Sequence, residues 1–200
     1  MARGVVDTDG MTSDWATALR QLQPSEGLGF DVTGIGHVVL KVTDLERSAK
    51  FYTEVLGFKV SDVYPATMMA GGMVFLRFNS DHHGLALIGG ASSATSSVEM
   101  HHMAFEVGTL DEVIRARDHL VKNAVPISFE GRRRAGCQIA VEFEDPDGHC
   151  LEIYWGLDQV GSEGQVRAPE GWREAQSIAD AVANPPAGQD TTIYSANLKP

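Results

Sequence analysis

An internal repeat constrains the fold of this 200-residue chain more than any other feature of its sequence. An offset of 65 residues places His37 on His102, and an offset of 66 residues places Leu85 on Leu151. A repeat of this length indicates two similar supersecondary units that bury a common face. The chain is therefore expected to fold from two related modules.

Both copies of the repeat have the pattern of a βαβββ unit. In the first copy, residues 35–42 predict a strand, and residues 44–57 predict a helix that begins at Asp44 and ends at Gly57. Short apolar runs separated by Gly, Ser and Asp then predict strands at 58–64, 71–78 and 83–90. In the second copy the corresponding elements are 101–107, a helix at 109–124, then 125–130, 137–145 and 149–155. This order predicts an α+β fold with mixed sheets.

The repeat also sets the expected domain organisation. One domain should span residues 33–157, with modules at 33–92 and 98–157. Residues 1–32 form an N-terminal arm with a short helix predicted at 13–22, and residues 158–200 form a C-terminal extension with a helix predicted at 171–183. Both ends are expected to be arms on the core or partly disordered extensions.

Composition and charge exclude several classes of binding partner. An apolar content of 43% is that of an ordinary globular chain, and a net charge of −11 argues against a nucleic-acid partner. The sequence shows neither a secretory signal nor an apolar run of about 18 residues, so no membrane partner is expected. The two cysteines, Cys137 and Cys150, are expected to be free thiols. We expect a cytoplasmic protein.

The alternation of side chains along the predicted strands selects three candidate metal ligands. Successive residues of a strand face opposite sides of the sheet, and the apolar rows of three strands suit packing against helices. That packing leaves His37, His102 and Glu152 on the other face, so two sheets that curl toward each other would bring these side chains together. Two imidazoles and one carboxylate suit Fe(II), and they also suit Mn, Zn, Ni or Co.

The repeat limits the number of these ligands. Ala86 matches Glu152 in the first copy, so the site would hold three protein ligands and leave positions open for substrate. A lone strand histidine or a Glu near a strand end is more commonly structural or solvated. Their shared face and their positions in the repeat together favour the metal site.

Several segments of the chain resemble the vicinal oxygen chelate superfamily, which includes glyoxalases, bleomycin-binding proteins and extradiol ring-cleavage dioxygenases. They are "GIGHVVLKVTDLERSAKFYTEVLGFKV", "FLRFNSDHHGLALI", "MHHMAFEV" and "FEDPDGHCLEIYWG". The second and third are similar to single-unit extradiol dioxygenases in particular. The resemblance implies paired βαβββ modules that form a cup around a divalent metal, with the ligands at His37, His102 and Glu152.

The resemblance also implies a chemistry. Extradiol enzymes bind Fe(II), a catecholic substrate and O2, and they open the aromatic ring during aromatic catabolism. A histidine near the bound dioxygen assists proton transfer in these enzymes, and His83 stands at that place. The alternative for His83 and its neighbour is an exposed loop pair. Members of this fold commonly dimerise, so a homodimer is expected.

The chain departs from the extradiol pattern before its last strand. Arg133, Cys137 and Glu142 stand where many such relatives carry a His, then a His or Asp, then a Tyr near the substrate oxygen. The run Arg132–Arg134 therefore has two interpretations, a carboxylate-binding group or a solvated loop. Cys150 shares the face of Glu152 and either lines the pocket or is a small buried apolar residue.

Three functions fit these observations. The leading one is an Fe(II)-dependent extradiol-type dioxygenase. The second is a redox-inert lyase, isomerase or epimerase of the same fold, in which the metal stabilises an enediolate. The third is a protein that sequesters a small hydrophobic ligand, and such a protein would not need the three metal ligands.

Overall fold

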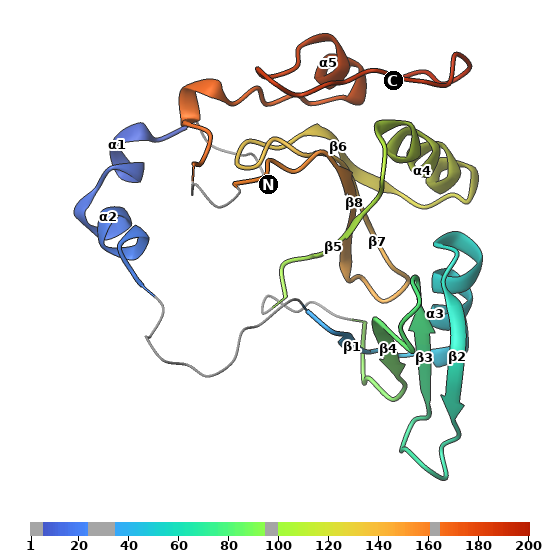
Figure 1. The fold of residues 1–200 in the computed structure, drawn as a ribbon. Helices are drawn as coiled ribbons and strands as arrows, with labels where there is room; N and C mark the ends of the chain where they lie inside the picture. Colours follow the sequence, from blue (N-terminus) through green and yellow to red (C-terminus); the bar gives the residue numbers. More distant parts are fainter. Residues whose placement is uncertain (1–5, 24–34, 95–99, 161–164) are drawn as a thin grey trace.

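The computed structural model describes residues 6–23, 35–94, 100–160 and 165–200, and these contain two βαβββ units (Figure 1). The first unit comprises β1 (Val38–Lys41), α3 (Leu45–Lys50), β2 (Lys59–Tyr64), β3 (Met73–Arg77) and β4 (Leu85–Ile88). The second comprises β5 (Met103–Glu106), α4 (Leu110–Lys122), β6 (Ile127–Arg132), β7 (Ile139–Glu144) and β8 (Cys150–Trp155). Two short helices precede them, α1 (Thr8–Met11) and α2 (Asp14–Arg20).

The two sheets have the same strand order. Each has four strands, β1-β4-β3-β2 in the first unit and β5-β8-β7-β6 in the second, and the first strand runs parallel to the last. In this register Val39 lies opposite Ala86, and Ala104 lies opposite Glu152. The predicted α+β class and the two βαβββ units are confirmed. The predicted domain limits at residue 32 and at residue 98 lie outside the described residues.

The helix α3 of the first unit is shorter than the span predicted for it, residues 44–57. The side chain of Asp44 accepts a hydrogen bond from the backbone N–H of Arg47, which starts α3 as expected. From Phe51 to Val55 the chain continues as a π-helical turn, and Leu56 N–H donates to the carbonyl of Phe51. Such wide turns occur as single insertions in α-helices. Here the turn carries Tyr52, which is fully buried.

One apolar core joins the two halves. It contains buried side chains of both units, among them Leu40, Tyr52, Leu85, Ile114 and Leu151. A second, smaller cluster on the first sheet contains Met73, Phe75 and Ala86. The first cluster therefore fixes the units to each other through burial of apolar surface.

A polar junction adds to this core. The loop after β7 carries Asp145 and Asp147, both nearly fully buried. Tyr52 donates its hydroxyl hydrogen to Asp145 Oδ2 at 2.9 Å, and Ser48 donates to Asp147 Oδ2 at 2.7 Å. The loop of the second unit is thus bonded to the helix of the first.

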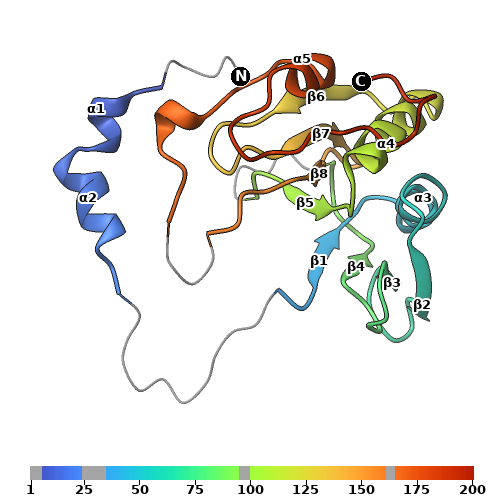
Figure 2. The same ribbon diagram turned by 45° about the horizontal axis from the view of Figure 1, so that its top comes forward.

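The C-terminal extension packs on the second unit. It contains a 3₁₀ turn (Pro169–Gly171) and α5 (Ile178–Ala183), and both views place α5 beside β6 (Figures 1 and 2). The predicted helix at 171–183 is too long, because Ala175 forms a β-bridge with Arg132 instead. Among the described residues, no helix has the length and apolar character needed to cross a bilayer.

Candidate metal centre

His102 and Glu152 lie together where two parallel strands adjoin. His102 immediately precedes β5, and Glu152 is on the neighbouring strand β8. His102 Nε2 lies 3.6 Å from Glu152 Oε2. The Glu152 side chain is only 2% exposed, whereas that of His102 is 41% exposed. The structure therefore brings two of the three predicted ligands side by side, with the His102 side of the pair accessible to solvent.

The electrostatics of Glu152 favour a bound cation. Burial raises the pKa of the Glu152 carboxyl, and this effect outweighs a hydrogen bond from Gln138 and the positive charges that His102 and Arg133 can supply. The carboxylate is thus a buried anion with little compensating charge. A divalent cation would supply that charge, so the donor chemistry of this pair fits a metal.

Gln138 was not identified from the sequence, and it lies directly behind Glu152. Its Nε2 donates to Glu152 Oε1 at 3.4 Å. Its own Oε1 is buried and has no hydrogen-bond partner among the described residues. The only sequence signal is its place just before β7, which does not reveal that the side chain reaches β8.

The three arginines Arg132–Arg134 all bind groups of the chain itself. Arg132 is fully buried beneath the C-terminal extension, and Arg134 Nε lies 2.6 Å from Glu174 Oε2. Arg133 Nε donates to Glu142 Oε1 at 2.7 Å, and its guanidinium lies 3.2 Å from the centre of the Phe129 ring. The solvated-loop interpretation of this run is therefore wrong, because Arg132 and Arg133 are buried.

His37 and His83 form a second pair on the first sheet. Their ring centroids are 4.7 Å apart. His83 also lies edge-on to the buried Phe75 ring at 5.1 Å, and its Nδ1 is 3.0 Å from Nδ1 of His82. His37 is exposed just before β1, beside the start of β4. Two imidazoles therefore gather at one edge of this sheet.

Within the described residues of one chain, the three predicted ligands thus lie in two places: two form one pair, and the third pairs with His83. His102 contacts Glu152, and His37 contacts His83. Within the described parts of the chain, no three His, Cys, Asp or Glu side chains are close enough to bind one ion. The meeting of His37, His102 and Glu152 around a metal stays a prediction.

The two cysteines contribute little to this centre. Cys137 is buried, burial raises the pKa of its thiol, and Sγ donates to the carbonyl of Arg134 at 3.3 Å. Cys150 is exposed, so its interpretation as a small buried residue is wrong. A thiol with a raised pKa is a poor nucleophile at neutral pH.

Comparison with known proteins gives a family match and curated relatives. Residues 34–153 match the family model of the glyoxalase/bleomycin resistance protein/dioxygenase superfamily. The chain is 33% identical over 156 residues to biphenyl-2,3-diol 1,2-dioxygenase of Paraburkholderia xenovorans, which covers 75% of this chain and 51% of that protein. It is 30% identical to the iron-dependent extradiol dioxygenase of Rhodococcus jostii, which covers 73% of this chain and 48% of that protein. The chain therefore spans about half the length of these relatives.

Solved structures give the same fold. Glyoxalase I of Leishmania major superposes with a TM-score of 0.51 and 28% sequence identity, covering 62% of this chain and 88% of that one. The family-model match at residues 34–153 includes residues of both βαβββ units.

Proposed function

The chain belongs to the glyoxalase/bleomycin resistance protein/dioxygenase superfamily, and from this premise we propose that it is an Fe(II)-dependent extradiol-type dioxygenase acting on a catecholic or related aromatic compound with O2. The observation that carries the proposal is the contact of 3.6 Å between His102 and the buried Glu152 carboxylate. Relatives named as dioxygenases at 30% and 33% identity support the reaction class.

Each proposed role follows from the chemistry of the side chain. His37, His102 and Glu152 would hold the metal. When bound, Fe(II) would bring the catecholate and O2 together. His83 would accept a proton from a substrate hydroxyl, because a neutral imidazole is a common general base and the ring of His83 packs against Phe75 and His37.

We also propose that two copies of the chain complete each centre. His37 and His83 lie on one sheet, whereas His102 and Glu152 lie on the other. The apolar side chain of Val39, two residues from His37 on the same face of β1, is 44% exposed. A second copy seated on this face would bury Val39 and place its own His102 and Glu152 near His37.

Metal analysis tests the ligands. Protein purified without oxygen is loaded with Fe(II), and bound iron and O2 uptake with a panel of catechols are measured. Glu152→Gln and His102→Ala should each lose most of the bound iron and the O2 uptake, and Glu170→Gln at an exposed position of the 3₁₀ turn is the matched control. Iron binding and turnover that persist in Glu152→Gln would contradict the proposal.

Mixing two inactive variants tests the shared centre. His37→Ala and Glu152→Gln should each be inactive alone. A mixed dimer keeps one centre with an intact His37 from one copy and an intact Glu152 from the other, so co-expression should restore part of the iron binding and activity. No restoration in mixed dimers verified by differently tagged copies would show that each centre lies within one chain.

A redox-inert lyase or isomerase is the second candidate. Glu142 stands opposite Glu152 in the β7–β8 register, at the place where the extradiol resemblance expects a tyrosine. Glu142 Oε1 accepts a hydrogen bond from Arg133 Nε, and an ionised carboxylate has no hydrogen to donate in place of the phenol. Turnover with Co or Ni and no O2 uptake would favour this candidate. Ligand binding that is unchanged in His102→Ala would favour simple sequestration.

A further inference from the structure

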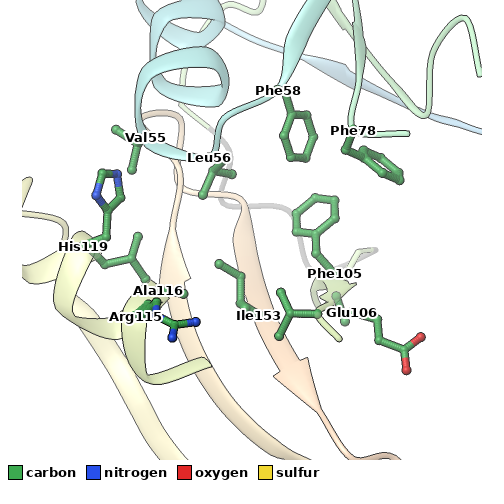
Figure 3. A pocket seen from close by; sticks show the side chains of 13 residues that line it. Val55, Leu56, Phe58, Phe78, Phe105, Glu106, Arg115, Ala116, His119 and Ile153 are labelled. Atoms are coloured by element: carbon green, nitrogen blue, oxygen red, sulfur yellow. The ribbon is translucent and has the colours of Figure 1, made fainter. Parts of the chain in front are cut away.

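We propose a second ligand site, for a small aromatic monocarboxylate, in a cavity where the two halves of the molecule meet. The cavity has a volume of about 700 Å³, within the range that drug-sized ligands occupy. It lies between the end of the π-helical turn, α4 and the strands β5 and β8 (Figure 3). This proposal is independent of the function proposed above.

The lining of the cavity is mainly apolar and aromatic. Phe58, Phe78 and Phe105 form a cluster with ring centroids 5.1 Å, 5.4 Å and 6.0 Å apart. Phe78 is 54% exposed although it packs against two other rings. Aliphatic side chains complete the wall: Val55, Leu56, Val107, Leu120 and Ile153. Such a wall suits a flat ring, which can stack on or against the phenyl groups.

The cavity is distinct from the candidate metal centre. Phe105 and Ile153 lie opposite each other in the β5–β8 register and belong to the core on the side of α4. Glu152 precedes Ile153 on the same strand, so its side chain points outward from the opposite face of the sheet. Neither His102 nor Glu152 lines the cavity.

Charges at the rim select the ligand. Arg115 donates through one nitrogen to Ser195 Oγ at 2.6 Å and lies 3.6 Å from Asp111. A guanidinium has five N–H groups, so donors remain for a ligand carboxylate. Figure 3 shows Glu106 on the other side of Ile153 from Arg115, with His119 one turn along α4. One anionic group is thus favoured at the Arg115 end, and a second one is disfavoured by Glu106.

Calorimetric titration of the metal-free protein with 2-naphthoate tests the site. The neutral analogue 2-naphthamide and the dianion naphthalene-2,6-dicarboxylate serve as matched probes. We expect 2-naphthoate to bind about tenfold more tightly than either, because its carboxylate can form a charge-assisted hydrogen bond with Arg115 that the amide cannot form, whereas the second carboxylate of the dianion meets Glu106. Equal affinity for all three probes, or no binding of 2-naphthoate, would overturn the proposal.

Variants locate the binding. Ala116→Trp should fill the cavity and abolish binding, and Arg115→Gln should reduce the affinity for 2-naphthoate to that for 2-naphthamide. Lys122→Gln removes a cation from the same helix outside the cavity, and it should leave the affinity unchanged. Arg115 is half exposed, so its variant tests the site even if Ala116→Trp does not fold. Binding that survives Arg115→Gln but is lost in Glu152→Gln would place the ligand at the metal centre and overturn the proposal.

Discussion

At the scale of single residues, Gln138 shows how the candidate centre is held. Its amide nitrogen donates to Glu152, while its carbonyl oxygen is buried without a partner among the described residues. A buried acceptor without a partner lowers the stability of the folded protein. The position of the Gln138 side chain is therefore not explained by stability. Its placement is explained if it orients a carboxylate that binds a cation.

Gln138→Met should therefore weaken metal binding much more than it changes the stability of the fold. The expected loss in affinity is about tenfold, typical of groups that hold a metal ligand in place, measured by competition with a chelating dye. The free energy of unfolding should change by about 1 kcal/mol or less, because removal of the unpaired oxygen offsets the loss of the hydrogen bond to the buried Glu152 carboxylate. Gln176→Met, at an exposed position, is the control, and an unchanged metal affinity in Gln138→Met would contradict the role.

At the scale of secondary-structure elements, β6 anchors the C-terminal extension through one guanidinium. Arg132 Nε donates to Gln189 Oε1 at 2.9 Å, and Nη1 donates to the carbonyls of Arg173 and Asn184 at 3.0 Å and 2.9 Å. Burial lowers the pKa of Arg132. A buried cation held mainly by carbonyl oxygens makes Arg132 the main polar anchor of α5, beside the apolar contacts of Ile178 and Ala181 with the core.

Arg132→Met should release the extension. Several buried acceptors would lose their donor, so we expect the free energy of unfolding to fall by roughly 3 kcal/mol or more, measured by urea denaturation. Limited proteolysis should cut residues 165–200 first. Arg134→Met, which removes a partly exposed ion pair, should cost about 1 kcal/mol or less. Equal losses in the two variants would show that Arg132 is not the anchor.

At the scale of the whole molecule, the two halves are joined by a polar bond network as well as by the core. Asp147 accepts hydrogen bonds from the backbone of Thr43 at 2.9 Å and from Ser48, and it pairs with Arg47 at 3.0 Å. Burial alone would raise the pKa of Asp147, but these contacts outweigh it and lower the pKa to about 2. The charged form of Asp147 therefore stabilises the junction.

The stability of the molecule should fall with pH for this reason. The pKa of Asp147 is depressed in the folded state from an ordinary 3.8, so its contribution is complete above that value and is lost as the pH falls toward 2. The loss is on the order of 2 kcal/mol, measured by urea denaturation between pH 5 and pH 2. Asp147→Asn should be less stable at pH 7 and should show a smaller slope. An unchanged slope would contradict this account.

The sequence predicted the fold well because repetition and strand alternation report directly on architecture. The positions of Leu85 and Leu151 in the repeat, and the alternation around Leu40, depend only on which face a residue takes. Contacts between side chains that are distant in the sequence could not be predicted in this way. The burial of Arg132 depends on Asn184, more than fifty residues away, and alternation along one strand carries no information about such a partner.

The same limit applies to the candidate centre. Alternation put His102 and Glu152 on one face of the sheet, and in the structure their side chains lie 3.6 Å apart, because parallel neighbours bring equivalent faces together. It also suggested that His37 would join them, whereas the contact it makes in the structure is with His83. The relative orientation of two sheets depends on the packing between them. The alternation along a single strand predicts which face a residue takes, and it does not predict that orientation.

The strand order has a consequence for how the protein folds during translation. Since β1 pairs with β4 and β5 pairs with β8, each sheet closes only when its last strand has emerged. The amino-terminal sheet can close while the rest is still being translated, yet Tyr52 and Ser48 must wait for Asp145 and Asp147. Until the second unit has been made, the nascent chain therefore exposes apolar side chains such as Leu40 and Leu85, which the second unit helps to bury in the finished core.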